Sequence, residues 1–380
     1  MKRFILSVSF CVLAAIIAFS PSSLVFAETK ATQGQVQNQL QVSEKDAIKA
    51  VKNFLKHSNE WDNQQLKVLA NLYDIEGNLT AYYIVAEKDG KEAGYFISSS
   101  TRDKSPVIQG GLGKSPLTQK VKKEISAGNK VYFLGVSALV GYKNENELRK
   151  GLELKRQELV TKLKKKKKFK DAEKMAKAQL KKPETSPENN RKWDFLLSDA
   201  SFQTQSVIVN YIDMNKFVFL NQNLVSFNPE TACGPTAGAM MAEYYENLGL
   251  GVRGINYYGK ATNLVTHLEE EMNTGVTGTW LDDFRDGLDQ HFQHNGQSWS
   301  TYSLDAEGNY AKVRQWIDGN APLAIMHQIP FVEWHWQVIV GYRLIDGYPW
   351  LSVADPATGS GAWVDYYEVD GYSSLVYTIK

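Results

Sequence analysis

Residues 228–245 read NPETACGPTAGAMMAEYY, and this stretch decides how we interpret the chain. A proline directly after Cys233 and Gly234 suits the first turn of a helix, where a missing N–H costs nothing. The apolar residues that follow recur at helical spacing, and Gly249 ends the pattern. We therefore place Cys233 at a helix N-terminus, where the macrodipole and the unpaired amides favour the thiolate over the thiol.

Cys233 is the one cysteine that would remain after export. The other, Cys11, lies in an N-terminal segment that has a basic start, an apolar run over residues 4–19 and small residues before position 28. This pattern is typical of a secretory signal peptide over residues 1–27. We expect a secreted protein, extracellular or associated with the cell wall, with no membrane contact after signal cleavage. A lone thiol is a liability outside the cell unless it does chemistry, although an inert buried cysteine stays open at this point.

Charge divides the chain into two halves. Its 380 residues are 43% hydrophobic and 22% charged, which is globular composition. Residues 193–380 hold 22 acidic and 8 basic residues, a net charge of −14, whereas residues 1–192 carry a net charge of +15. Opposite charges predict that the halves attract each other, and they argue against a nucleic-acid partner for the basic half.

Residues 28–112 are predicted to form a small α+β domain. Ser43 starts a helix as its N-cap, and strand-like runs follow over residues 66–73, 81–86 and 94–99, joined by turn sequences. In this helix and the antiparallel meander that follows it, we recognise no catalytic constellation.

Residues 113–192 are predicted to be a Lys-rich helical segment that ends in a polar, proline-containing linker. The lysines could form a solvated helix face, a contact with the acidic half or with an anionic cell-wall polymer, or a processing site. Residues 193–380 then form the last domain, which is long enough for a large core.

A cysteine nucleophile needs a base, and His335 is our candidate. It stands at the start of an aromatic-rich strand over residues 334–342, and Asp355 ends a second strand over residues 350–354. Two adjacent antiparallel strands would bring the carboxylate of Asp355 to the imidazole of His335, fixing its tautomer and orientation. An ordinary turn is the alternative for Asp355.

The other histidines are weaker candidates. His57 lies in the front half, His327 follows an apolar run near His335, and His267, His291 and His294 lie in polar helical stretches, where we expect surface residues. Neither a cofactor nor a metal is predicted, because one thiol and scattered imidazoles show no ligand spacing that we recognise.

The Cys-Gly-Pro-Thr start of the helix, the later His-Trp-x-Val-x-Val-Gly-Tyr and the final Val-Ala-Asp-Pro together resemble the papain-like bacteriocin-processing peptidases, which cleave after double-glycine leaders. The resemblance covers about 185 residues at the C-terminus and is closer to secreted, stand-alone relatives. It implies a papain-like domain of α+β class, in which an N-terminal helix carrying Cys233 packs on an antiparallel sheet. It also implies a Cys233–His335–Asp355 triad.

The same resemblance implies a glutamine upstream of the nucleophile that helps to bind the oxyanion. Gln222 is our candidate and Asn228 competes with it; the backbone N–H of Cys233 would be a second donor. The pair Gly110-Gly111 offers a self-cleavage site of the double-glycine type.

Residues 94–100 and 105–108 are similar to the pro-segment of streptopain-type secreted cysteine proteases. That likeness implies a front domain that covers the active-site cleft and keeps the enzyme latent, so that the chain's own pro-domain acts as its inhibitor.

The sequence predicts an exported cysteine peptidase made as a zymogen, acting on a peptide or protein substrate through a thioester acyl-enzyme. Two alternatives stay open. The triad could serve an amidase or acyltransferase on cell-wall peptide, or the domain could be a degenerate peptidase fold that only binds cell-wall polymer.

Overall fold

The computed structural model describes residues 40–56, 64–136, 138–165, 172–173, 187–198, 207–225, 228–275, 278–294, 296, 298–329, 333–369 and 373–380. The predicted signal peptide, His57 and most of the lysine run lie outside these residues. Residues Leu40–Lys380 group into one compact unit. In the described part of the chain, no helix has the length and apolar character needed to cross a membrane.

The front half contains the predicted helix and strands. Ser43 accepts a hydrogen bond from the Asp46 backbone N–H and so caps the first helix. Gly77 and Gly90 have φ values of 84° and 71° in the turns between the strands, a backbone conformation that glycine adopts at no steric cost. The elements of this half are α2 (Glu44–Leu55), β1 (Gln65–Tyr73), β2 (Leu79–Lys88), β3 (Lys91–Ser99), β4 (Gln109–Leu112), α3 (Pro116–Ser126), β5 (Lys130–Gly135), β6 (Ala138–Tyr142), α4 (Glu145–Lys165) and α6 (Pro187–Leu197).

The segment after residue 112 is not wholly helical, which corrects the sequence prediction. β5 pairs in parallel with β1, and β6 pairs with β5, so both extend the sheet of the front half. Val131 and Tyr132 are both buried although they point to opposite faces of the strand, because α3 and α4 cover the sheet there. A strand buried on both faces lacks the alternation of apolar and polar residues that marks a half-buried strand. The lysines on either side of β5 favoured the interpretation as a polar helix instead.

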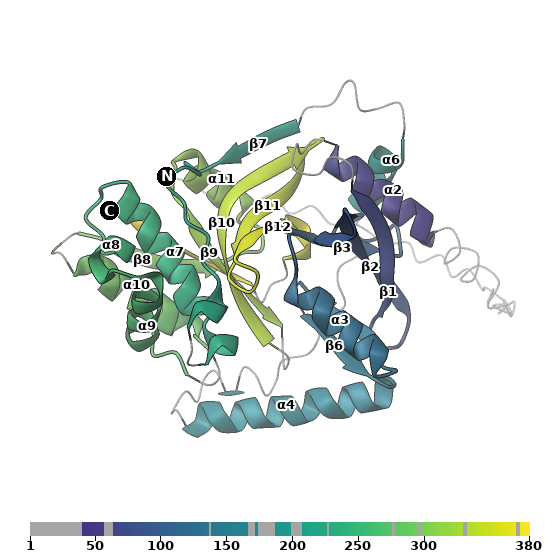
Figure 1. Cartoon of the computed structure of the whole chain (residues 1–380), viewed down its shortest axis with the longest axis horizontal. Helices are drawn as coiled ribbons and strands as arrows, with labels where there is room; N and C mark the ends of the chain where they lie inside the picture. The colour runs from purple at the N-terminus through teal and green to yellow at the C-terminus, as the bar shows by residue number, and fades with distance from the viewer. Residues whose placement is uncertain are drawn as a thin grey trace, which may run out of the picture. The chain divides into compact units, whose positions relative to one another are not determined.

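The second half places a bundle of helices beside the sheet (Figure 1). Helices α8, α9 and α10 lie next to α7. Most strands of this half come after these helices in the sequence. The elements are β7 (Val207–Tyr211), η3 (Gln222–Leu224), η4 (Pro229–Thr231), α7 (Cys233–Asn247), α8 (Ile255–Tyr258), α9 (Ala261–Glu271), α10 (Leu281–Gln293), β8 (Ser300–Asp305), α11 (Tyr310–Asp318), β9 (Leu323–Ile329), β10 (Glu333–Ile345), β11 (Tyr348–Asp355), β12 (Ser360–Asp365), η5 (Tyr366–Glu368) and β13 (Ser374–Ile379).

Among the described residues, one sheet of 13 strands runs through both halves. The strand order is β6-β5-β1-β2-β3-β4-β12-β11-β10-β9-β13-β8, and β7 pairs with β10 outside this path. The halves meet where β4 pairs antiparallel with β12, setting Gly110 opposite Trp363 and Gly111 opposite Ala362. The halves are thus joined by backbone hydrogen bonds.

Gly110 and Gly111 are needed at this junction. A Cβ atom on Gly110 would lie 2.3 Å from the Phe96 ring, and one on Gly111 would lie 2.7 Å from the Tyr95 ring. Both glycines are buried and β4 is paired on both sides, with β3 and with β12. The structure therefore argues against this pair as a self-cleavage site, because a protease must bind its substrate as a free, extended strand.

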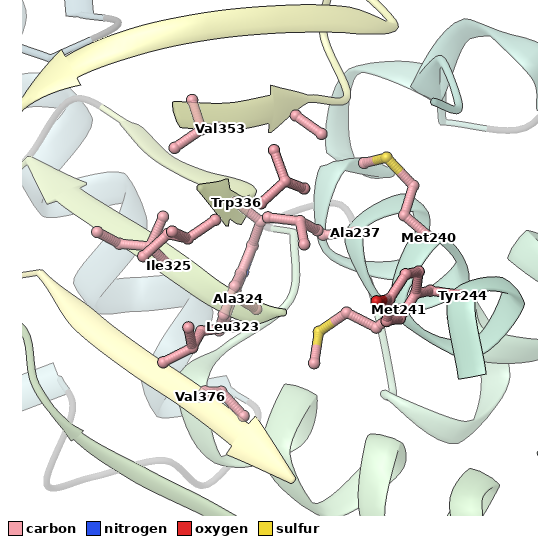
Figure 2. Close-up of a cluster of buried hydrophobic side chains, with 14 of the residues drawn as sticks. Ala237, Met240, Met241, Tyr244, Leu323, Ala324, Ile325, Trp336, Val353 and Val376 are labelled. Carbon is pink, nitrogen blue, oxygen red and sulfur yellow. The ribbon is translucent and has the colours of Figure 1, made fainter. Parts of the chain in front are cut away.

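The core of the second half lies between α7 and the sheet. Figure 2 shows Ala237, Met240, Met241 and Tyr244 of α7 beside residues of the strands, and all of these side chains belong to one buried cluster. The strand side chains that Figure 2 labels are Leu323, Ala324 and Ile325 of β9, Trp336 of β10, Val353 of β11 and Val376 of β13. This packing fixes α7, and with it Cys233, against the strands β10 and β11.

Candidate active site

Helix α7 begins at Cys233, whose side chain is free of any disulfide and buried, with 5% of the residue exposed. The chain enters the helix through η4, after Asn228 has turned it in a left-handed conformation with φ 47°. The thiol therefore lies where the first backbone N–H groups of a 15-residue helix are unpaired. A thiolate at this position is stabilised by the positive end of the helix dipole.

Gly234 lets a second segment approach the start of α7. A Cβ atom on Gly234 would lie 2.4 Å from Thr279 Oγ1 and 2.6 Å from Thr279 Cβ. Thr279 is fully buried, and its carbonyl accepts a hydrogen bond of 2.9 Å from Trp336 Nε1 of β10. The segment around Thr279 thus connects the nucleophile helix to the strand that carries the histidine.

The register of β10 and β11 brings His335 and Asp355 together. Val338 pairs with Ala354, so continuing that ladder by one residue sets Gln337 beside Asp355. His335 lies two residues before Gln337 on the same face of β10, which makes it the diagonal neighbour of Asp355. Its Nε2 atom is 2.7 Å from Asp355 Oδ1.

Asp355 is buried, with 3% of the residue exposed, and its carboxylate has three partners. These are His335 Nε2 at 2.7 Å, Gln337 Nε2 at 3.0 Å and the Ala357 backbone N–H at 2.9 Å. Burial by itself raises the pKa of the carboxyl, but the charge of His335 and the three hydrogen bonds outweigh it and lower that pKa below its usual value. Asp355 is therefore ionised at neutral pH.

The contacts that lower the pKa of Asp355 raise the pKa of His335. Burial lowers the pKa of its imidazole, but the charge and hydrogen bond of Asp355, together with a hydrogen bond to Cys233, raise that pKa well above 6.5. Since Nε2 faces Asp355, Nδ1 is the ring nitrogen left for Cys233. The arrangement favours a protonated imidazole next to Asp355 and Cys233, which is the histidine–cysteine pairing that activates a cysteine nucleophile.

Gln337 extends this hydrogen-bonded chain, and the sequence interpretation missed it. Its Oε1 atom lies 3.1 Å from His327 Nε2, so one amide connects Asp355 to a second histidine. His327 is the register partner of His335 and is 2% exposed. Burial and the charge of His335 lower the pKa of His327 to about 4, so it is neutral and suits a structural role. The period of two along β10 is the signal that could have singled out Gln337.

The structure brings Gln222 next to the other predicted residues but gives its amide a different partner. The Gln222 backbone N–H donates to the Pro356 carbonyl at 2.8 Å, directly after Asp355. Its Nε2 atom donates to the Pro229 carbonyl at 2.9 Å, whereas Oε1 is buried and has no hydrogen-bond partner. To donate to an oxyanion, the Gln222 amide would have to break its hydrogen bond to the Pro229 carbonyl and donate to the substrate oxygen instead. The competing residue, Asn228, accepts a bond from Thr231 through its backbone carbonyl.

Two tryptophans lie beside these residues and are covered by α4. The rings of Trp280 and Trp334 are 4.4 Å apart, and Trp334 directly precedes His335. Leu163 of α4 is buried in the same cluster, with Leu159 and Val160 packed against it. The end of the Lys-rich segment thus contacts side chains that neighbour both Thr279 and His335.

Of the three histidines that we predicted at the surface, His291 is buried, whereas His267 and His294 are partly exposed. His267 lies in α9 and His291 in α10, with His294 just after α10, but His291 is only 1% exposed. All three face the carboxylate of Glu271, and the four side chains are grouped closely enough to hold a metal ion. The sequence signal was a His-x-x-x-Glu in one helix and a His-x-x-His in the next, which our search for metal motifs overlooked.

Comparison with known proteins bears on the second half of the chain. No curated protein matches the chain. Residues 214–377, however, match a family model described as the Peptidase_C39 like family, and this range includes Gln222, Cys233, His335 and Asp355. The α+β architecture with its large sheet is consistent with such a fold. The match supports a relationship to papain-like cysteine peptidases, and hence a peptidase that belongs to the hydrolases.

Proposed function

We propose that this protein is an exported cysteine peptidase, made as a zymogen, that hydrolyses peptide bonds through Cys233, His335 and Asp355. The observation that carries the proposal is the chain of contacts from the Cys233 thiol through the His335 imidazole to the Asp355 carboxylate. The family match supports the reaction class, and the predicted signal peptide over residues 1–27 supports export.

The first step is acylation of the enzyme. The Cys233 thiolate attacks the carbonyl carbon of the substrate, and the electron pair of the C=O bond moves to oxygen. The backbone N–H of Cys233 donates to that oxyanion, and the Gln222 amide joins it after leaving the Pro229 carbonyl. The tetrahedral species then collapses to a thioester, while the His335 imidazolium gives its proton to the departing amine.

The second step releases the acyl group. Neutral His335 takes a proton from a water molecule, which attacks the thioester carbon, and cleavage of the C–S bond regenerates the thiolate and the imidazolium. If an amine attacks instead of water, the same residues perform acyl transfer on cell-wall peptide. The mass of the product separates the two outcomes, because hydrolysis adds one water and transfer joins two fragments.

Latency is proposed to depend on α4. Leu163 and its neighbours pack on Trp280 and Trp334, so this helix occupies the surface beside His335 that an extended substrate would need. Lys164 and Lys165 at its end are exposed, where an anionic cell-wall polymer can reach them. Cleavage or displacement of this segment would open the site.

The decisive experiment compares the purified full chain with its Cys233→Ala and His335→Ala variants. We expect the unaltered chain to shorten over time in intact-mass measurements and to cleave a denatured protein substrate, while both variants stay intact and inactive. Alkylation by iodoacetamide should be fast at neutral pH, and slow in His335→Ala, which retains the thiol but loses the proton acceptor. Equal alkylation rates in both proteins, or retained proteolysis in Cys233→Ala, would contradict the triad.

A further inference from the structure

Four metal-ligating side chains converge outside the active site, on two packed helices. His267 and Glu271 are four residues apart in α9, so they share one face of that helix. His291 and His294 are three residues apart at the end of α10 and share a face in the same way. One ligand atom from each of the four lies within 4.8 Å of every other.

The three imidazole rings form a regular triangle. Each pair of ring centroids among His267, His291 and His294 is 5.7 Å apart. For a tetrahedral ion with metal–nitrogen bonds of about 2.0–2.1 Å, the centroids of its imidazole ligands lie about 5 Å apart. The rings are therefore placed as three ligands of one ion would be, with Glu271 as the fourth.

The contacts of His291 direct one ring nitrogen at the Glu271 carboxylate and the other at a backbone carbonyl. Nε2 lies 2.8 Å from the Arg253 carbonyl, which can only accept, so Nε2 carries the proton. Nδ1 lies 2.8 Å from Glu271 Oε2, which is hydrogen-bond distance. Metal-bound histidines commonly donate their other N–H to a carbonyl in this way, which fixes the ring and its tautomer.

The two outer histidines point their nitrogens at the other carboxylate oxygen. His267 Nε2 lies 3.1 Å from Glu271 Oε1, yet the atom is buried and makes no hydrogen bond. His294 Nε2 contacts the same oxygen. A carboxylate needs one cationic partner for an ion pair, whereas here three imidazoles face it; a divalent cation would accept one lone pair from each of the four side chains.

The helices approach each other closely enough to build this cluster. A Cβ atom on Gly287, one turn before His291, would lie 2.8 Å from the Glu271 backbone carbonyl. On the other side, the methyl group of Met272 lies 2.5 Å from where a Cβ on Gly238 of α7 would stand. The cluster thus sits where α9 and α10 are packed against the helix that begins at Cys233.

We propose that His267, Glu271, His291 and His294 bind one divalent transition-metal ion of the zinc class. Three nitrogens and one carboxylate oxygen suit tetrahedral Zn²⁺, and four protein ligands make a closed, structural site. The buried His291 and Glu271 form its floor, and the side chains of His267 and His294, 32% and 26% exposed, leave an approach from solvent. The ion fastens α9 to α10 next to Met272, which packs against Gly238 of α7.

The test uses the full chain with Cys233→Ala, so that no zinc can bind at the catalytic thiol. After dialysis against EDTA and addition of Zn²⁺, we expect one zinc per chain by elemental analysis and a rise in Tm. Co²⁺ in place of zinc should give the absorption bands of tetrahedral coordination. The double variant His267→Ala/His294→Ala should bind zinc more than about 100-fold more weakly and lose both the rise in Tm and the cobalt spectrum.

The control is Glu270→Gln, which changes an exposed carboxylate next to Glu271 and should bind zinc as the parent does. Tm values measured in EDTA show whether the double variant folds; if it does not, Glu271→Gln, which keeps all three imidazoles, takes its place and should lose the tetrahedral cobalt spectrum. Zinc that fails to bind the parent above background, or that binds the ligand variants as tightly as Glu270→Gln, overturns the proposal. The four side chains would then be held together by hydrogen bonds and ion pairs with Glu271, without a metal ion.

Discussion

A carboxylate that accepts three hydrogen bonds in a buried position holds its proton weakly, and Asp355 is such a group. Its charge keeps the pKa of His335 above the ordinary value, despite burial. A group with a raised pKa in the folded protein stabilises the fold below its unfolded pKa, and this contribution is lost as the pH rises through the folded value. Catalysis should follow the same upper limit, because the imidazolium must supply the proton of the leaving amine.

Asp355→Asn is therefore expected to lower the alkaline limit of activity. Without the carboxylate charge, burial lowers the pKa of His335, and the imidazolium is lost at a lower pH. We expect kcat/KM to fall by about 100-fold at neutral pH, less than the loss in Cys233→Ala, and its alkaline limb to move toward lower pH. The pH profile of kcat/KM measures both effects.

Asp346→Asn, in the exposed turn between β10 and β11, is the matched control and should leave the profile unchanged. An unchanged alkaline limb in Asp355→Asn would contradict the role given to Asp355.

Gln337→Leu is expected to destabilise the protein by about 1–3 kcal/mol, because it leaves Asp355 Oδ2 and His327 Nε2 buried without a partner. Urea unfolding of the full chain gives the change in the free energy of unfolding. Gln315→Leu, on the exposed side of α11, serves as the control and should change it by less than about 0.5 kcal/mol. A neutral effect of Gln337→Leu would mean that the amide does not support the carboxylate.

At the scale of elements, the proposed latency depends on the position of α4. One face of this helix contacts Trp280 and Trp334 through Leu163, while Leu154 on the same helix is 57% exposed. Leu148 and Leu152 anchor the first part of α4 on the sheet, whereas Leu163 provides a buried contact at its end, so a substitution there can weaken the end alone.

Leu163→Asp is expected to raise the basal activity of the uncleaved chain, because a buried carboxylate would push the end of α4 away from Trp280 and Trp334. The measurement is the initial rate of peptide hydrolysis, together with intact mass to show that the chain is uncleaved. Leu154→Asp adds the same charge to the exposed face and should leave the rate unchanged. Equal rates of peptide hydrolysis in the two variants would contradict the proposal that α4 keeps the enzyme latent.

On the scale of the whole molecule, the continuous sheet makes the two halves one folding unit. β4 pairs with β12, Ser105 Oγ donates to Asp365 Oδ2 at 2.5 Å, and Trp350 Nε1 donates to the Val107 carbonyl at 3.0 Å. Lys192 forms a buried ion pair with Asp365 at 2.7 Å. Separating the halves would expose an unpaired strand edge and these polar groups.

A cut between α4 and α6 should therefore leave the two fragments associated, because the β4–β12 pairing and the Ser105 and Trp350 hydrogen bonds still connect them. We expect a chain with a specific protease site inserted among residues 174–186 to elute after cleavage at the volume of the intact protein. Size-exclusion chromatography with mass analysis of the peak checks this. Under strong denaturant the fragments should separate, and separation in native buffer would show that the β4–β12 junction is too weak to hold them.

The sequence by itself determined the local features. Helical spacing and Pro235 predicted that a helix begins near Cys233, and the aromatic-rich run and the Ala354-Asp355-Pro356 turn predicted the strands that carry His335 and Asp355. These signals are local, because capping, turn chemistry and periodicity each act over a few residues. The structure contains each of these elements.

Only the tertiary structure decided which distant side chains meet. The register of β10 and β11 selects Gln337 as the partner of Asp355, the Pro229 carbonyl claims the amide of Gln222, and the close crossing of α9 and α10 gathers three histidines around Glu271. Register, crossing distance and the β4–β12 pairing depend on contacts between residues far apart in the chain. No periodicity within a single element encodes such contacts, since the same local pattern is compatible with several pairings.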